Sequence, residues 1–264
     1  MDKLELSPEL EKFRDKIESS LKPFIAIRAE KNDNLALWQS KFGGLPYLPK
    51  GYEYPKGIQD TPLFLLAQIN FEEASDLEGF PQSGILQFYI GGDDFYGANW
   101  DNPTKQDNFR VVYFPEVSKI ESDLVTDFSF LPEQTELPLF ESCSLQFEKK
   151  IAPVGMGDYE FEKIFDQRFF EEFGDQEEDV WDEYDNKFPS QGHKIGGYAF
   201  FTQDDPRAVG KGAVVGKDIL LLQIDTDDDA DIMWGDSGVG NFFISQADLE
   251  KRDFSQVLYT WDCC

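Results

Sequence analysis

The sequence predicts a mainly β fold of the α+β class. In this fold, roll-like antiparallel sheets come from an internal duplication, and peripheral helices lie at the N-terminus and in the middle of the chain. Three observations support this prediction. The 25 phenylalanines lie mostly in short runs with Ile, Leu, Val and Tyr, as in packed strands. Glycine and proline divide the chain into turns. Two distant parts of the chain also repeat the same motifs in the same order.

The repeat begins with Ser40–Gly44 (SKFGG) in one part and with His193–Gly197 (HKIGG) in the other. Each motif is followed by a continuous apolar run that ends in Gln-Ile, and then by Ser-Gly and a second apolar run. Four matches in one order, at similar intervals, favour duplication of one supersecondary unit over chance. The Gly-Gly pairs follow no phosphate-loop spacing, so we expect a turn or bulge there, where glycine permits positive φ.

The repeat also sets the expected domain organisation. A chain of 264 residues is long enough for one large domain. We predict a single domain over 1–264, with repeat halves at approximately 24–117 and 193–264. A connecting helical and acidic segment, 118–192, is expected to join the two halves.

The first half is expected to begin with a helix. Ser7 provides an N-cap hydroxyl, Pro8 suits the first turn, and Pro23 ends the helix. A strand over 24–29 follows. The apolar stripe expected on this helix consists of Leu10, Phe13, Ile17 and Leu21.

Strands dominate the rest of the first half. The continuous apolar run 63–71 predicts a buried strand, and 85–90 and 109–114 predict two more. Residues 91–103 are rich in Gly, Asp and Asn, which predicts a long exposed loop that carries Trp100.

The connecting segment mixes structure types. Weak alternation over 144–151 indicates a strand, and 158–173 has helical spacing of apolar residues with Asp158 as its cap. The densely acidic stretch 175–185 is either a second helix with one apolar stripe or disordered. Trp181 within it, like Trp100, is either exposed as a protein-contact site or folded back onto a satellite cluster.

The β pattern returns in the second half. Strands are expected over 198–201, 219–224, 240–244 and 256–261. A short helix is expected over 248–252.

The charge of the chain limits its partners. Fifty-two Asp and Glu residues oppose 24 Lys and Arg residues, for a net charge of −28. A field of this sign repels phosphate backbones and anionic lipid surfaces, so we expect neither nucleic acid nor membrane as a partner. The same field attracts a basic protein or a cation. The simpler alternative is a solvated acidic surface that keeps the protein soluble.

The chain is expected to be cytoplasmic. Its first residues lack the basic start and apolar core of a signal peptide, and no apolar run approaches the length of a membrane span. Cys143, Cys263 and Cys264 form no disulfide framework, and two of them are adjacent. These features fit a reducing compartment.

Several motifs, each weak alone, are specific in combination. They are Phe42–Pro49, Pro62–Ile69, Trp234–Gly238, Phe242–Ile244 and Asp253–Ser255. With these motifs the chain resembles the YwqG-like family, a bacterial family whose defining domain has no known function, over nearly its whole length. The resemblance implies a mainly β roll with internal pseudo-symmetry and peripheral helices. It supplies no established catalytic residues, and it is loosely associated with bacterial toxin systems.

His193 is the sole histidine, so any Ser-His-Asp or Cys-His arrangement has to use it. Neither Cys143 nor Ser190 lies in a nucleophile motif. The structural alternative, which we favour, is that His193 caps or hydrogen-bonds the start of a strand.

An acidic loop suggests a cation site. Asp225, Asp227 and Asp229 occupy the first, third and fifth positions of an EF-hand-like pattern, and Asp236 the twelfth. Ala230 stands where such a loop requires glycine, so a true EF-hand is rejected. A looser oxygen site for a divalent cation such as Ca²⁺ stays open as a minor alternative to an exposed hairpin. No other cofactor is expected, because the Cys and His residues have no usable zinc spacing.

Gln68 and Gln223 are the matched polar residues of the two repeats. Buried amides must be hydrogen-bonded, so we favour a role in which each clamps neighbouring backbone. The functional alternative is that both line a shared groove, with other polar and aromatic residues from the two halves. Those further residues are Trp38, Arg207, Trp234 and Asp236.

Two functions from different classes follow. The leading hypothesis is a non-enzymatic, acidic binding protein that engages a basic protein partner, in the manner of an immunity protein that neutralises a toxin. The alternative is an enzyme or small-ligand binder with a cleft between the two β repeats, where His193, Gln68, Gln223, Arg207, Trp234 and Asp236 would lie.

Overall fold

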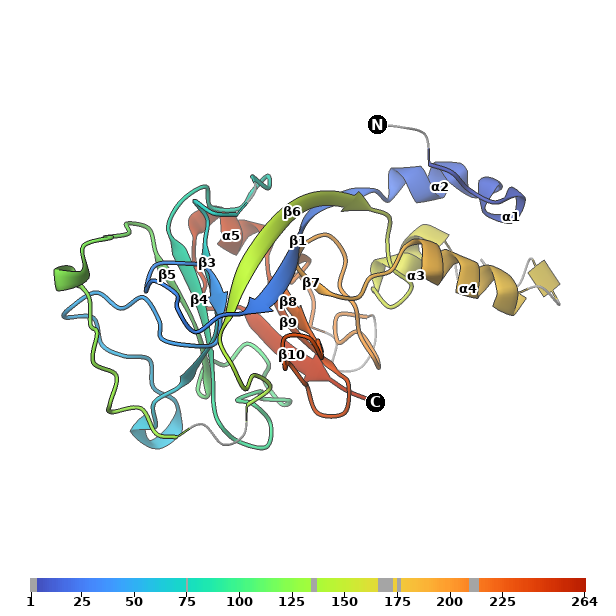
Figure 1. Cartoon of the computed structure of the whole chain (residues 1–264). Helices are drawn as coiled ribbons and strands as arrows, with labels where there is room; N and C mark the ends of the chain where they lie inside the picture. The colour runs from blue at the N-terminus through green and yellow to red at the C-terminus, as the bar shows by residue number, and fades with distance from the viewer. Residues whose placement is uncertain (1–3, 75, 134–136, 166–172, 175–176, 209–213) are drawn as a thin grey trace.

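One antiparallel sheet of ten strands organises the chain in the computed structural model (Figure 1). The structure describes residues 4–74, 76–133, 137–165, 173–174, 177–208 and 214–264. Within these residues the strand order is β10-β9-β8-β7-β1-β6-β2-β3-β4-β5, and the sheet curls into a nearly closed, barrel-like form. The predicted mainly β class with few, peripheral helices is confirmed.

The strands follow the repeat. The first five are β1 (Lys22–Lys31), β2 (Lys41–Phe42), β3 (Phe64–Asn70), β4 (Ile85–Ile90) and β5 (Phe109–Phe114). The second five are β6 (Cys143–Ala152), β7 (His193–Gly196), β8 (Ile219–Asp225), β9 (Val239–Ile244) and β10 (Leu258–Asp262).

The two halves are joined at the centre of the sheet by an exchange of strands. β1 pairs with β7 of the second half, and β6 pairs with β2 of the first half. Between these pairings β1 and β6 pair with each other along their full length, and they curve side by side across the middle of the molecule (Figure 1). The segment 118–192 therefore contributes a central strand to the sheet as well as helices.

The equivalent strands β3 and β8 are covered on both faces, which is why their sequences are continuous apolar runs. One large cluster fills the inside of the curled sheet. Separate clusters, which include Tyr89 in the first half and Phe243 in the second, cover its outside. Each of the two strands also shifts register against its neighbour, at Leu65–Ala67 and at Leu220–Leu222.

The Gly-Gly pairs end β2 and β7 with sharp turns. Gly44 and Gly197 both have φ of +70°, a left-handed conformation that glycine adopts without strain. The predicted turn at each pair is confirmed. After each turn, the chain crosses the outer face of its own half of the sheet.

A seam connects the two edge strands, β5 and β10. The amide of Gln106, in the loop between β4 and β5, accepts from Val111 N of β5 at 2.9 Å and donates to the Phe254 carbonyl at 2.6 Å. Tyr259 N of β10 donates to the Pro103 carbonyl of the same loop at 2.9 Å. The loop therefore occupies edge groups that would otherwise be open to pairing with another chain.

Helices gather at one end of the sheet (Figure 1). They are α1 (Pro8–Glu11), α2 (Arg14–Ser19), α3 (Glu160–Phe165) and α4 (Glu177–Lys187), and they share one apolar cluster. Elsewhere lie α5 (Gln246–Lys251) and the short 3-10 helices η1 (Ile58–Asp60) and η2 (Glu121–Asp123).

Three expectations about helices have clear outcomes. The first helix is split in two, because Phe13 between α1 and α2 has φ of −112° and ψ of 11°, outside the helical region. The stretch 177–185 is helical, and residues 175–176 lie outside the described residues. None of the helices in the described ranges is long and apolar enough to cross a bilayer.

The strand expected over 198–201 is wrong. This stretch is an irregular part of the outer layer. The backbone of Phe200 is bonded by side chains, with its N–H to Gln223 Oε1 at 2.8 Å and its carbonyl to Asn241 Nδ2 at 2.9 Å. A short, mostly buried apolar run resembles a strand in sequence, although here side-chain amides and not a neighbouring strand bond its backbone.

We expect Gln106→Ala to lower the free energy of unfolding by about 1–3 kcal/mol, because it leaves Val111 N and the Phe254 carbonyl without partners at the seam. Urea unfolding followed by tryptophan fluorescence measures this loss. Gln82→Ala is the control, because the exposed Gln82 side chain bonds the carbonyl of Phe80, two residues away, and no other group in the described part of the chain. An equal loss in both variants would contradict the role of the seam.

Candidate functional site

Gln68 lies buried in β3, and its amide bonds the outer loop of the first half and Gln87 of β4, whose Nε2 donates to Gln68 Oε1 at 2.7 Å. Gln68 Oε1 also accepts from Tyr47 N at 2.7 Å. Its Nε2 donates to the carbonyls of Leu37 and Gln39 at 2.8 and 2.7 Å. Gln68 thereby fastens the outer loop of the first half to the sheet.

Gln223 of β8 repeats this arrangement. Its Oε1 accepts from Phe200 N, and its Nε2 donates to the carbonyls of Ser190 and Gly192 at 3.1 and 2.7 Å. Both matched glutamines therefore clamp backbone within their own halves, as in the structural interpretation of the sequence.

One buried lysine completes the clamp in each half, Lys41 in the first and Lys194 in the second. The sequence analysis did not identify either of them. Lys41 Nζ donates to the carbonyls of Ala36 and Leu45 at 2.8 and 3.1 Å. Lys194 Nζ donates to the carbonyls of Ser190 and Tyr198. Burial lowers the pKa of each lysine to about 8. The available signal was the Lys that precedes an apolar residue and Gly-Gly in both repeats.

His193 is bonded on both ring nitrogens. Its Nδ1 accepts from Asp225 N at 3.0 Å, so Nε2 carries the proton and faces Asp227 Oδ2 at 3.2 Å. In the first half Ser40 Oγ accepts from Asn70 N at 2.9 Å in the matching place. His193 thus joins the start of β7 to the end of β8. Its hydrogen bond lowers the pKa of Asp227.

Two of the three predicted cation ligands, Asp225 and Asp227, use their carboxylates on nearby backbone groups and on His193. Asp225 accepts from Gly192 N at 2.6 Å and Thr226 N at 2.9 Å, and burial raises its pKa. Asp227 Oδ1 accepts from Asp229 N at 3.0 Å, while the Asp229 side chain is exposed. Among the described residues, no group of three or more acidic, His or Cys residues is placed to hold a metal ion.

Trp234 and Asp236 follow the acidic loop 225–231 and precede β9. Trp234 is fully buried in the core, against Tyr96 at 5.6 Å between ring centroids. Asp236 is exposed, and its carbonyl accepts from Cys264 N at 3.4 Å. Trp38 is half-buried and accepts from Asn70 Nδ2 through its carbonyl at 3.0 Å.

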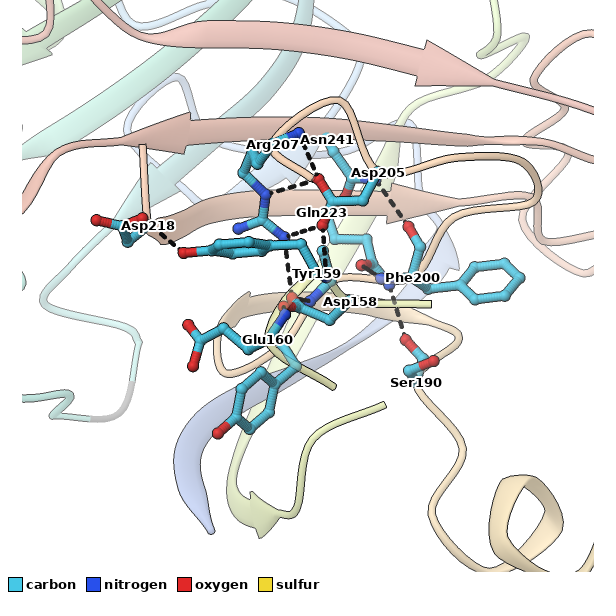
Figure 2. A network of polar contacts seen from close by, with 12 residues as sticks. Asp158, Tyr159, Glu160, Ser190, Phe200, Asp205, Arg207, Asp218, Gln223 and Asn241 are labelled. Carbon is cyan, nitrogen blue, oxygen red and sulfur yellow. Dashed lines mark hydrogen bonds and ion pairs between the residues drawn. The ribbon is translucent and has the colours of Figure 1, made fainter. Parts of the chain in front are cut away.

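Arg207 forms a buried ionic cluster with two carboxylates (Figure 2). Its Nη2 donates to Asp158 Oδ2 at 2.9 Å and to Asp205 Oδ2 at 2.7 Å, and its Nε donates to Asp205 Oδ1 at 2.9 Å. Asp158 Oδ1 also accepts from Glu160 N at 3.0 Å and caps α3 as the sequence predicted. The cluster therefore ties the helical end of the molecule to the sheet.

The first half has an aromatic residue where this cluster stands. Tyr54 and Arg207 lie equally far after their Gly-Gly pairs. Tyr54 packs edge-on against Tyr89 of β4 at 5.8 Å, and the guanidinium of Arg207 lies 3.9 Å from the ring centre of Phe243 in β9. The second half therefore has a charged contact where the first half has a neutral aromatic contact.

This difference between the halves also affects one buried polar atom, Asn241 Oδ1. Tyr89 donates its hydroxyl to Gln87 Oε1 at 2.9 Å in the first half. Phe243 has no hydroxyl, and Asn241 Oδ1 in the position of Gln87 has no hydrogen bond within the described residues. A buried polar atom without a partner costs about 1–3 kcal/mol, so this position is less well satisfied in the second half than its counterpart in the first.

A cavity of about 580 Å³ lies beside the ionic cluster. Its walls include Asp158, Tyr159 and Lys163 from one segment and Asp204 and Asp205 from another. The residues expected to share a groove do not meet there, because Gln68, Gln223, His193, Trp234 and Asp236 are absent from its walls. Arg207 approaches it only through its partners, Asp158 and Asp205.

Comparison with protein families places most of the chain in one family model. A family model described as a domain of unknown function (DUF1963) matches residues 40–263. No curated protein matches the chain. The matched region contains both Gly-Gly turns, the Gln and Lys side chains of both clamps, and the ionic cluster.

We expect Arg207→Met to cost about 3–5 kcal/mol of unfolding free energy, because the buried carboxylates of Asp158 and Asp205 lose their cation. The triple variant Arg207→Met/Asp158→Asn/Asp205→Asn is expected to lose less, because its buried groups are neutral. Urea unfolding of both variants makes the comparison. A triple variant less stable than the single one would argue against a charge effect.

We expect the ammonium groups of Lys41 and Lys194 to lose their protons near pH 8 in the folded protein, below the ordinary lysine value of 10.5. Between pH 8 and 10.5 the folded state then binds fewer protons than the unfolded chain. Their contribution to stability is therefore flat below pH 8 and rises as the pH increases through this window.

Titration of ¹⁵N-labelled lysine Nζ signals by NMR measures these values. Lys41→Met and Lys194→Met assign one signal each and reduce the rise in stability. Glu73 faces Lys41, and Asp158 and Asp225 face Lys194, and all three carboxylates favour the charged amine. Two signals that titrate near pH 10.5 would contradict the prediction.

Proposed function

This chain belongs to the DUF1963 family, and from that premise we propose that it is a non-enzymatic, acidic binding protein for a basic protein partner. We further propose that it is a YwqG-like member of this family that works in the cytoplasm. An immunity protein that neutralises a basic toxin would have these properties.

The excess of carboxylates carries the proposal. The chain has 52 Asp and Glu residues against 24 Lys and Arg residues. Three of the basic side chains, Lys41, Lys194 and Arg207, are buried and hold the fold together. Three acidic side chains, Asp158, Asp205 and Asp225, are buried as well, so the whole excess of negative charge lies on the remaining, more exposed residues. Such a field speeds association with a basic protein.

The bonding of the sole histidine supports a non-enzymatic role. His193 is buried with Asp225 N on one ring nitrogen and Asp227 on the other, which suits a fixed structural residue. Gln68 and Gln223 use their amides on backbone groups. These groups would have to leave their present bonds before they could act on a substrate.

The cysteines support a reducing compartment. Cys143, Cys263 and Cys264 are all free thiols. Cys143 is buried in β6, and burial raises its pKa to about 11. Its thiol is therefore protonated at neutral pH and unreactive.

Binding of a small ligand is the alternative function. The observation that favours it is the cavity of about 580 Å³ beside Arg207. This cavity lies between segments 156–163 and 203–208, whereas the sequence analysis had placed a cleft between the two β repeats. Its charged walls, with Lys163 and Asp204, would suit a polar molecule.

We expect the protein, immobilised at low ionic strength, to capture a basic protein that then binds as a purified pair. The association constant of the pair should fall steeply as the salt concentration increases, because exposed charges are screened beyond about 10 Å at 0.1 M salt. Calorimetry across a salt series measures this dependence. Recovery of no basic partner, or binding that is insensitive to salt, would contradict the proposed function.

A variant tests the role of charge directly. Changing Glu177, Glu178 and Asp182 of α4 to their amides keeps side-chain shape and removes exposed charge. The association rate should fall while the thermal unfolding temperature stays nearly unchanged.

A further inference from the structure

A hollow of about 300 Å³ lies between η1 and the loop that joins β4 to β5. We call it the Trp100 groove. Its walls include Ile58 and Trp100, together with the carboxylates Asp93, Asp101 and Asp107. Trp100 and Ile58 are 52% and 56% exposed, and the neighbouring Phe95 is 54% exposed. This is much apolar surface to leave in water within an acidic protein.

Trp100 is held in place by a chain of ring contacts that starts in the core. The buried Trp234 packs on Tyr96, Tyr96 on Trp261 at 4.9 Å, and Trp261 on Trp100 at 5.9 Å. Trp261 Nε1 also donates to the Phe95 carbonyl at 2.8 Å. The exposed indole is therefore positioned before any partner arrives, which reduces the entropy cost of binding.

The groove carries negative charge with little compensation. Asp107 is paired with Lys105 at 2.6 Å. Asp93 Oδ1 accepts from Phe95 N at 3.0 Å and Gly97 N at 2.9 Å, and its Oδ2 accepts from Asn108 Nδ2. These neutral donors fix the position of the carboxylate without cancelling its charge. Within the described residues neither Asp93 nor Asp101 has a cationic partner.

These features together define a ligand chemistry. The face of an indole attracts a cation within about 6 Å of the ring, and a carboxylate beside it adds a charge-assisted hydrogen bond. An acidic cluster alone would only attract small ions. The exposed indole, the hollow and the net charge of −28 together favour a large cation with an apolar stem.

Resting on the proposed function, we propose that the Trp100 groove binds an arginine side chain of the basic protein partner. The planar guanidinium stacks on Trp100 and donates to Asp101 and Asp93. The arginine stem contacts Ile58. Arginine suits this site better than lysine, because its flat, weakly hydrated head both stacks and forms paired hydrogen bonds.

A second exposed tryptophan provides a matched control. Trp181 is 44% exposed on the acidic helix α4, so it combines an indole with carboxylates as Trp100 does. It lines none of the hollows described above. A general attraction of basic chains to acidic surface would involve both tryptophans equally.

The probe is a short synthetic peptide of alternating arginine and glycine, with a peptide of citrulline and glycine as its uncharged match. Isothermal calorimetry at low salt measures the affinity of the intact protein and of Trp100→Ala, Asp101→Asn and Trp181→Ala. Circular dichroism checks that each variant is folded. Because Trp100 is exposed at the end of its ring stack, its removal is expected to leave the fold intact.

We expect Trp100→Ala to weaken binding of the arginine peptide about tenfold, within the range of a partly desolvated cation–π contact. Asp101→Asn should weaken it several-fold, and Trp181→Ala should bind like the unchanged protein. The citrulline peptide should not bind. Equal binding of both peptides, or an equal effect of the two tryptophan variants, would overturn the proposal.

The two levels of inference can fail separately. Salt-dependent binding of the arginine peptide that Trp100→Ala leaves unchanged would overturn the groove and leave the acidic binding function standing. No binding of the peptide, with a captured basic protein that binds Trp100→Ala normally, would have the same meaning. No peptide binding and no basic partner would remove both.

Discussion

The whole structure depends on one constraint, which is that a sheet covered on both faces excludes water from the loops that cover it. Backbone groups in those loops still need hydrogen bonds, and water cannot supply them. Gln68 and Lys41 supply them in the first half, and Gln223 and Lys194 in the second. In each half, one buried amide and one buried ammonium group form hydrogen bonds with the backbone of the outer loop. Placing these polar groups in the sheet is unfavourable by itself, but leaving the loop carbonyls unbonded would be worse.

Local sequence pattern could predict the strands, because strand burial leaves a local signature. The limits 85–90 and 109–114 match β4 and β5, and the continuous apolar runs marked β3 and β8 as buried. The exchange of β1 and β6 between the halves could not be predicted in this way. It depends on which distant strand each one meets, and neither strand carries a motif for its partner. The ionic cluster was missed for the same reason, since Asp158, Asp205 and Arg207 are brought together only by the fold.

The residues that the sequence analysis singled out were chosen because polar side chains stand out among apolar neighbours. That criterion finds buried polar groups whether they are structural or functional. In this protein Gln68, Gln223 and His193 join backbone to backbone. The two halves differ at one position of the outer layer, and this difference shows where the helical end is attached. Arg207 stands where the first half has Tyr54, and its carboxylate partner Asp158 also caps α3. The second half therefore has charged side chains in its outer layer, at the place where the helices α1 to α4 meet the sheet.

The loop between β4 and β5 links the closure of the sheet to its outer surface. Gln106 and the Pro103 carbonyl bond both edges of the seam, and the same loop carries Trp100. Trp261 belongs to β10 and supports the Trp100 ring, so the groove exists only while the edge strand stays in place. A ligand that binds only the folded arrangement stabilises it by an amount that rises with the logarithm of the ligand concentration once this exceeds the dissociation constant. The proposed arginine ligand would therefore contact the loop that bridges the edge strands β5 and β10, and would stabilise the seam as it binds.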